Sequence, residues 1–129
     1  MARSKRYEKL ITNAKKGVTE ISAEDAVEIV KESDNVVLID VREKEEWNEE
    51  HIPEAIHCSR GTIESEIEEK VPDDTTMIIC HCGGGGRSAL VAQSLQKMGY
   101  ENVWSLTGGF KAWKDLGLPT GKSPRKSEK

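Results

Sequence analysis

The sequence is poor in aromatic residues and in cysteine, and it has no long apolar run. Phe, Trp and Tyr make up 5% of the 129 residues, and phenylalanine occurs once. Three cysteines, Cys58, Cys80 and Cys82, are too few for a disulfide framework, which fits a reducing compartment. No segment has the pattern of a signal peptide or the apolar length of a membrane span. We therefore expect a cytoplasmic protein with no membrane partner.

Charge is spread unevenly along the chain. Residues 1–16 hold +5 and residues 120–129 hold +3, so the net charge of −4 leaves −12 on the middle. An acidic middle argues against a nucleic-acid partner. The length, with 36% hydrophobic and 33% charged residues, fits one soluble domain with a sizeable core. We expect a basic extension at residues 1–17, with a short helix, one domain at 18–119, and a basic disordered tail at 120–129.

Segments typical of strands alternate with segments typical of helices. Apolar runs of strand length occur at residues 18–21, 36–41, 77–80 and 103–106, and a third short strand precedes Arg60. Helical spacing of apolar residues marks residues 7–16, 22–30, 63–71 and 88–98, and a short helix carries Phe110 and Trp113. Such alternation is typical of an α/β fold with a parallel sheet.

Several local features refine these expectations. Ser22 begins a segment that resembles a helix capping box. Residues 43–50 hold five glutamates around Trp47, which predicts a solvated helix with Trp47 packed inward. The helix at residues 7–16 is expected to pack on the outside of the domain. Trp104 and Trp113 are expected in the core.

The most informative segment is a short glycine run between a strand and a helix. Residues 80–88 read Cys-His-Cys-Gly-Gly-Gly-Gly-Arg-Ser. Four glycines have the length of a connection in a compact α/β unit, and they favour positive-φ turns or a ligand held against the backbone. A thiol here faces bare N–H groups and a helix N-terminus, which favour the thiolate. Arg87 adds a fixed positive charge, so the segment suits an anionic sulfur and an anionic substrate.

This segment resembles the active-site loop of the rhodanese family of sulfurtransferases, in which a cysteine is followed by four residues, an arginine and a helix. Further blocks match in the same order, at residues 37–43, 51–57, 99–113 and 116–119. The resemblance implies a rhodanese-like α/β fold, with a central, mostly parallel five-stranded sheet and helices on both faces. Glu50 and Glu54 stand where the family usually has glycine, so any positive-φ turn there must be rebuilt.

The resemblance implies a sulfurtransferase in which Cys82 carries a persulfide. The sulfane sulfur would come from thiosulfate or a persulfide donor and pass to a thiophilic acceptor such as cyanide, a thiol or a protein, without a metal or organic cofactor. The expected catalytic residue is Cys82, the expected substrate-binding residues are Gly83, Gly84, Gly85, Gly86 and Arg87, and the expected supporting residues are Asp40, Arg42 and Ser88. Asp40 and Arg42 follow a strand two residues apart, and we interpret them as structural braces rather than substrate contacts.

Three other functions remain open. A persulfide carrier that docks a partner protein would turn over small donors slowly. A cysteine phosphatase or arsenate reductase would use the same groups, but the phosphatase relatives have five residues between Cys and Arg, where this chain has four. A non-catalytic module of the family commonly lacks the cysteine.

The remaining histidines and cysteines allow two further hypotheses. A zinc site could use His57, Cys58, Cys80, His81 and Cys82, but a Cys-x-Cys pair lacks the usual ligand spacing. His81 precedes Cys82 directly, so in an extended strand it faces the other side of the sheet and is poorly placed as a base. Cys80 would either resolve an oxidised Cys82 or simply pack in the core.

Overall fold

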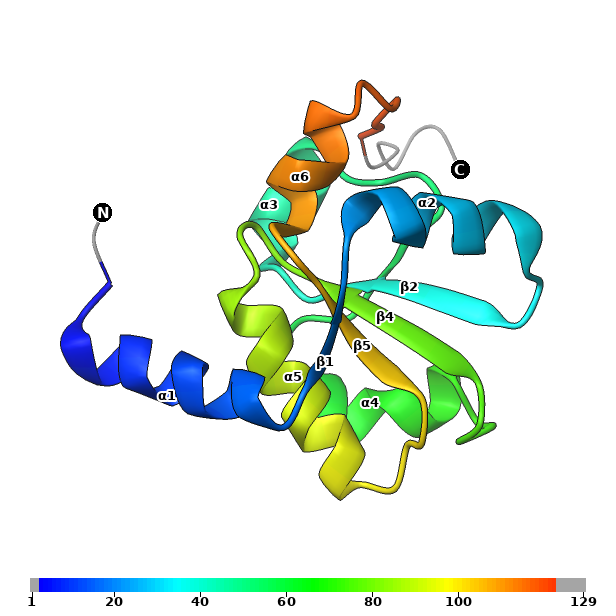
Figure 1. Ribbon diagram of the computed structural model, residues 1–129. Coiled ribbons are helices and arrows are strands. Elements are labelled where there is room, and N and C mark those ends of the chain that lie inside the picture. The colour runs from blue at the N-terminus through cyan, green and yellow to red at the C-terminus, as the bar shows by residue number, and fades with distance from the viewer. Residues whose placement is uncertain (1–2, 123–129) are drawn as a thin grey trace.

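The computed structural model describes residues 3–122, in which helices and strands alternate around one sheet (Figure 1). The strands are β1 (Thr19–Ile21), β2 (Val36–Asp40), β3 (Ile56–His57), β4 (Met77–His81) and β5 (Val103–Leu106). The helices are α1 (Lys5–Lys16), α2 (Ala23–Glu32), α3 (Lys44–Glu49), α4 (Ile63–Lys70), α5 (Gly86–Lys97) and α6 (Gly109–Asp115). The five strands are all parallel, in the order β1-β5-β4-β2-β3, which confirms the predicted α/β fold.

The sheet is buried on both faces, and successive residues of a strand belong to different cores. In β4, Ile78 and Cys80 pack in a cluster with residues of α4 and α5. Ile79, between them, packs in a second cluster with residues of α2 and α6, including Phe110 and Trp113. This alternation is the period of two that a strand imposes. It divides the molecule into an α5 side and an α6 side, and the carboxyl end of β4 lies between them.

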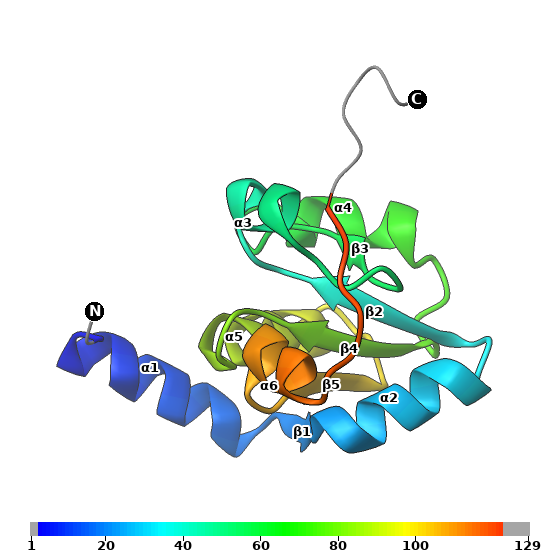
Figure 2. The same cartoon turned by 90° about the horizontal axis from the view of Figure 1, so that it is seen from above.

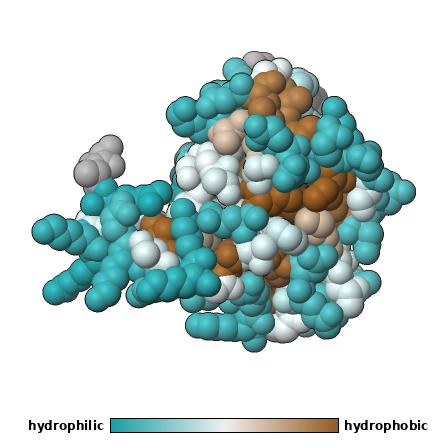
Figure 3. Space-filling view, viewed as in Figure 1, coloured by the Kyte–Doolittle hydropathy of each residue, from teal (hydrophilic) through white to brown (hydrophobic). Residues whose placement is uncertain are grey.

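Helix α1 packs on the outside of α5, as expected from its sequence (Figures 1 and 2). The hydroxyl of Ser4 caps its first turn by accepting the N–H of Tyr7 at 3.3 Å. Ile11 and Ala14 are buried against Ala89 and Leu90 of α5. The first turns of α1 extend past the body of the domain and show a mainly hydrophilic surface (Figure 3).

The tryptophans and the helix cap at Ser22 mostly follow the sequence predictions. Trp113 is buried in the core as predicted, whereas Trp104 is only partly buried, and its indole N–H donates to Asn102. Trp47 packs partly buried against the α6-side core and stacks on the ring of His51, with centroids 3.7 Å apart. The Ser22 hydroxyl accepts the N–H of residue 25 at 3.2 Å and so caps α2.

The chain rebuilds the turns around Glu50 and Glu54 without a left-handed residue. Glu50 has φ −167°, which is extended backbone, and within residues 3–122 only glycines have positive φ. His51 forms a two-way backbone bridge with Gly121, and the Thr120 hydroxyl donates to the Glu50 carboxylate. Of the tail expected at residues 120–129, residues 123–129 lie outside the described part of the chain. Within that part, no helix combines the length and apolar character needed to cross a membrane.

Candidate active site

The glycine loop joins the central strand β4 to α5 and holds Cys82 at its start. β4 extends to His81, one residue further than expected, because its parallel pairing with β2 continues to Asp40. α5 begins at Gly86, two residues before Ser88, because Gly85 has φ 108° and ends the loop in the left-handed region. Cys82 is 1% exposed, so its sulfur lies in the floor of the loop.

Hydrogen-bonding groups of the loop and of α5 face the sulfur of Cys82. The backbone N–H of Gly85 donates to Sγ at 3.1 Å, and the hydroxyl of Ser88 lies 3.7 Å from the same atom. Ser88 is itself fully buried and lies 2.8 Å from the hydroxyl of Ser105 on β5. The structure therefore brings Cys82, the loop glycines and Ser88 together, as the sequence predicted.

Two effects oppose each other in setting the pKa of Cys82. Burial by itself raises the pKa, because a buried thiolate loses its hydration. The N–H and hydroxyl of Ser88 and the N–H groups of Gly85 and Gly84 all stabilise the thiolate. Together they prevail, and the pKa of Cys82 is lowered from its ordinary value. Cys82 is thus more readily ionised than a free cysteine, although it is buried.

The other two cysteines show the opposite behaviour. Burial raises the pKa of Cys80 strongly, and the sulfur packs in the α5-side core. Burial also raises the pKa of Cys58 to about 12, and its thiol donates to the Glu66 carboxylate at 3.3 Å. Both therefore stay protonated at neutral pH, and the geometry fits the packing role for Cys80.

Arg87 does not stand free at the loop, because Glu46 of α3 binds it. Arg87 Nη1 donates to Glu46 Oε1 at 2.7 Å, and Nη2 donates to Oε2 at 3.2 Å. This pair raises the pKa of Arg87 and lowers that of Glu46. The arginine side chain also passes close to the loop, since a Cβ atom on Gly83 would lie 3.2 Å from Nη2. Glu46 belongs to the segment that was predicted to form a solvated acidic helix, but its carboxylate contacts the arginine of the loop.

Asp40 and Arg42 form a buried ion pair behind the loop. The Asp40 carboxylate accepts three donors of Arg42, namely the backbone N–H at 2.9 Å, Nε at 3.0 Å and Nη2 at 2.8 Å. Arg42 Cζ lies 4.2 Å from the centre of the Phe110 ring, and the Phe110 N–H donates to the carbonyl oxygen of Cys82 at 2.7 Å. The pair therefore contacts the residue that holds the backbone of Cys82, and this placement fits the interpretation of Asp40 and Arg42 as braces.

Gly109, which sequence analysis placed only in a turn, is in direct contact with the loop. It has φ +56°, and a Cβ atom there would strike the carbonyl oxygen of Cys82 and lie 2.9 Å from that of Gly83. The N–H of Lys111 donates to the same Gly83 carbonyl at 3.3 Å. The first turn of α6 thus clamps the backbone of Cys82 and Gly83. The sequence Thr-Gly-Gly indicated a turn at this position. It could not indicate the contact with Cys82, which lies more than 20 residues earlier in the chain.

His81 and Cys82 face opposite sides of the sheet, as predicted. The His81 ring lies near Phe110 on the α6 side, with ring centroids 6.2 Å apart, whereas Cys82 belongs to the α5-side core. Burial lowers the pKa of His81 to about 4, so the ring is neutral at neutral pH. Its Nε2 lies 3.8 Å from an Asp40 oxygen, and among residues 3–122 this nitrogen has no hydrogen-bond partner. His81 therefore does not reach Cys82 Sγ as a base.

The ligand set considered for zinc is not brought together. Over residues 3–122, no group of three or more His, Cys, Asp or Glu side chains has the arrangement of a metal site. His57 instead hydrogen-bonds to the carbonyl of Arg42, with its Nε2 2.8 Å from that oxygen.

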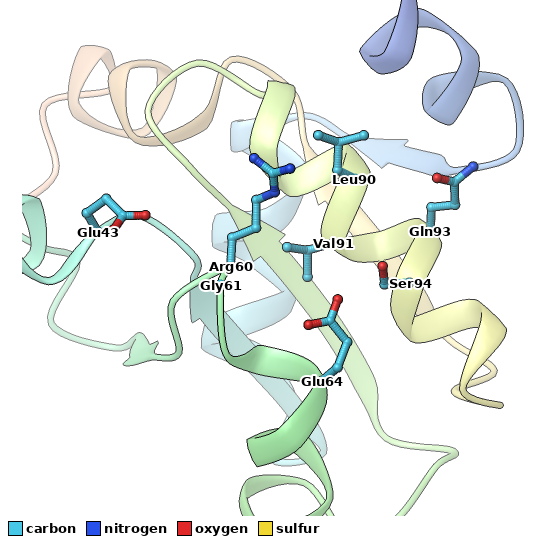
Figure 4. A pocket seen from close by; sticks show the side chains of 8 residues that line it. All are labelled: Glu43, Arg60, Gly61, Glu64, Leu90, Val91, Gln93 and Ser94. Atoms are coloured by element: carbon cyan, nitrogen blue, oxygen red, sulfur yellow. The ribbon is translucent and has the colours of Figure 1, made fainter. Parts of the chain in front are cut away.

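Of two hollows in the surface, one touches the glycine loop and the other lies further along α5. One, of about 270 Å³, is lined by Gly83 and by Phe110, Lys111, Lys114 and Asp115 of α6, so it opens beside Cys82. The other, of about 420 Å³, lies between α5 and the segment that precedes α4 (Figure 4). Arg60 and Glu64 face Leu90 and Val91 there, and neither Cys82 nor the loop glycines line it. The first hollow is thus the one in contact with the candidate site.

The family model for the rhodanese-like domain matches residues 22–116. The chain belongs to the rhodanese-like domain family. It is 37% identical over 95 residues to the thiosulfate sulfurtransferase GlpE of Coxiella burnetii, covering 74% of this chain and 86% of that protein. It is 33% identical over 96 residues to a Bacillus subtilis protein named "Putative sulfur carrier protein YrkF", covering 74% of this chain and 51% of that one.

Solved structures show the same fold. A Rhodopseudomonas palustris protein of unknown function, described as a possible tyrosine phosphatase, has a TM-score of 0.80 at 30% identity. That match covers 94% of this chain and 96% of the other, so it extends well beyond residues 22–116. A thiosulfate sulfurtransferase of Pseudomonas aeruginosa has a TM-score of 0.78 at 25% identity, covering 86% of this chain and 21% of the other.

Proposed function

We propose that the protein is a sulfurtransferase that moves a sulfane sulfur from thiosulfate or a persulfide donor to a thiophilic acceptor through a persulfide on Cys82. One observation carries the proposal: the buried sulfur of Cys82 accepts the N–H of Gly85, and loop donors lower its pKa. Relatives named as a thiosulfate sulfurtransferase and as a sulfur carrier support the same chemistry. A nucleophilic thiolate at neutral pH is what sulfur transfer requires.

The first half of the cycle loads the cysteine. The Cys82 thiolate attacks the outer sulfur of thiosulfate and forms an S–S bond. The donor's own S–S bond breaks, and sulfite leaves with its electron pair. The terminal sulfur of the Cys82 persulfide is then an anion, and the backbone N–H groups of the glycine loop stabilise its charge. No external oxidant, metal or organic cofactor enters this step.

The second half regenerates the thiolate. A nucleophilic acceptor such as cyanide or a thiolate attacks the terminal sulfur, and Cys82 Sγ leaves with the electron pair of the S–S bond. The Ser88 hydroxyl lies 3.7 Å from Sγ and stabilises this leaving thiolate, together with the N–H of Gly85. Asp40 and Arg42 contribute indirectly, because they fix Phe110 and so hold the backbone of Cys82 in place.

A protein-docking persulfide carrier is the second candidate function. Cys82 is 1% exposed, and the hollow that reaches the loop holds about 270 Å³. The likeness to the sulfur carrier of B. subtilis favours this alternative. A carrier would pass sulfur to a protein cysteine at least about tenfold faster than it turns over thiosulfate with cyanide.

Mass spectrometry of the intact protein under non-reducing conditions tests the proposal. Thiosulfate should add one sulfur atom to the native chain, and subsequent cyanide should remove it. Cys82→Ser should acquire no sulfur, while the matched variant Cys80→Ser should behave as the native chain does. Absence of the adduct, together with Cys82-dependent hydrolysis of an aryl phosphate, would establish phosphatase chemistry and refute sulfur transfer.

A further inference from the structure

The N-terminal segment, which precedes the residues matched by the family model, reaches the catalytic loop. A Cβ atom built on Gly86 would lie 3.0 Å from Nη2 of Arg3 and 2.8 Å from Cδ1 of Ile11. Gly86 is the first residue of α5, and the N–H of its neighbour Gly85 donates to Cys82 Sγ. The Arg3 guanidinium therefore lies against the outer edge of the loop that surrounds the reactive sulfur.

Packing of α1 places the helix beside the start of α5. Ile11 and Ala14 are 2% and 1% exposed, and they lock α1 against Ala89 and Leu90 of α5. The absence of a side chain at Gly86 leaves the space that Ile11 and Arg3 occupy. Arg3 directly precedes Ser4, the N-cap of α1, so the packing of α1 brings the Arg3 backbone near the start of α5, and the Arg3 side chain also pairs with Glu8 at 3.8 Å.

Arg3 differs from the other cations beside the loop in how it is paired. Arg87 is bound by Glu46 at 2.7 Å. Lys111 and Lys114 line the hollow next to the loop, and they are hydrogen-bonded to Asp115 at 3.2 Å and to Glu50 at 2.9 Å. Within the described part of the chain, Arg3 pairs with the carboxylate of Glu8 at 3.8 Å, and its side chain is 37% exposed. Its charge is consequently the least neutralised of the four.

We propose that Arg3 is a specificity-determining residue, which attracts doubly charged small sulfur donors of the thiosulfate type to Cys82 in preference to donors of lower charge. The proposal rests on the proposed function for its substrate class, but its physical basis is the potential at the loop. A fixed cation next to the site raises the local concentration of an anion, and a dianion gains about twice the interaction energy of a monoanion. The basic N-terminal extension thereby becomes part of the active site of an otherwise acidic domain.

The first experiment measures this potential without any sulfur transfer. Cys82 is alkylated with iodoacetate, an anion, and with iodoacetamide, which is neutral, at low ionic strength, and the two rates are read from the Cys82 peptide. Arg3→Gln should lower the ratio of the two rates about two- to fivefold. Lys16→Gln removes the same charge at the other end of α1 and should leave the ratio within about 1.5-fold. Equal ratios in the native chain and Arg3→Gln would overturn the proposal.

The second experiment measures donor selectivity with cyanide as acceptor. In Arg3→Gln, KM for thiosulfate should rise about three- to tenfold with kcat nearly unchanged, and KM for the monoanion methanethiosulfonate should rise by about the square root of that factor. Arg3→Lys should restore most of the loss, and 0.5 M NaCl should abolish the difference. A fall in kcat with unchanged KM would refute a role in attraction.

The two proposals fail in distinguishable ways. If Cys82 forms no persulfide but Arg3→Gln still changes the alkylation ratio, the proposed sulfur transfer is wrong, whereas the attraction of anions by Arg3 is supported. If the persulfide forms but the ratio and both KM values are unchanged, the proposed function stands and the role of Arg3 is refuted. Circular dichroism of each variant, compared with Lys16→Gln, establishes that α1 remains folded.

Discussion

Cys80 and Cys82 lie two residues apart, face the same side of the sheet and are almost equally buried, yet their thiols differ in chemistry. Cys80, within β4, is 0% exposed, and burial raises its pKa. Cys82, one residue past the strand, is 1% exposed, and its pKa is lowered. The backbone donors of β4 are used by neighbouring strands, whereas those of the glycine loop are directed at the sulfur. The two pKa values therefore differ because of the hydrogen-bonding groups of the loop and not because of exposure to solvent.

The largest effect expected from this comparison is on the two cysteines themselves. Cys82→Ser should abolish transfer of sulfur from thiosulfate to cyanide, because a serine hydroxyl is not ionised at neutral pH and forms no persulfide. Cys80→Ala should keep the rate within about twofold of native and lose about 1 kcal/mol of stability through the small cavity that it leaves. Steady-state thiocyanate formation and urea unfolding measure the two quantities. Loss of activity in Cys80→Ala would show that the strand cysteine takes part in the chemistry.

A displacement of the loop should produce the next largest effect. In Gly109→Ala, the new methyl group would strike the Cys82 carbonyl oxygen, and φ +56° disfavours any residue with a side chain. We expect at least a tenfold fall in the transfer rate and a stability loss of about 1–3 kcal/mol. Gly99→Ala is the matched control, since it has φ +103° but nothing within 4 Å of a Cβ atom. Gly99→Ala should lose stability but retain activity. An equal loss of activity in Gly99→Ala and Gly109→Ala would contradict the role of Gly109 in holding the backbone of Cys82.

Removing one donor should produce a smaller and pH-dependent effect. Ser88→Ala removes the hydroxyl near Cys82 Sγ but keeps the Ser88 backbone N–H, so the pKa of Cys82 should move up toward its ordinary value. At pH values below the new pKa the thiolate fraction then falls, and the transfer rate falls with it. The rate should recover as the pH rises through the new pKa. An equal loss at every pH would indicate misplacement of the sulfur rather than a change of pKa.

The smallest predicted effect concerns the charge above the loop. Glu46→Gln removes the carboxylate that pairs with Arg87, so the guanidinium should become available to an anionic donor. KM for thiosulfate should fall about two- to fivefold, while kcat changes little. Glu45→Gln, an exposed change of the same charge on the same helix, should change KM by less than about 1.5-fold. A rise in KM for Glu46→Gln would mean that the ion pair positions Arg87 for the donor.

The parts of the site that are local in sequence could be predicted from sequence. The period of two in β4 placed His81 and Cys82 on opposite sides, and the strand, glycine run and helix placed Cys82 beside a helix N-terminus. The order of apolar segments likewise gave the α/β class. The predicted start of α5, at residue 88, was two residues too late, because Gly85 in the left-handed region allows the helix to begin at Gly86.

The contacts between distant segments could not be predicted in this way. Glu46 and Arg87 are 41 residues apart, and nothing in the sequence of residues 43–50 indicated that one of their five glutamates, Glu46, turns toward the loop. Gly109 reaches Cys82 across the sheet, and Arg3 reaches Gly86 from a segment that the sequence indicated only as basic. Such contacts depend on the packing of whole helices, which residue patterns within one element do not specify.

The most direct test of the account is the pH dependence of alkylation at each cysteine of the native protein. Iodoacetamide at a series of pH values, with each cysteine peptide quantified by mass spectrometry, gives the midpoint for Cys82 alongside Cys58 and Cys80. The account predicts a Cys82 midpoint below the ordinary thiol value of about 8.5, with Cys58 and Cys80 unreactive at that pH. A Cys82 midpoint at or above that value would contradict the claim that the glycine loop creates the thiolate.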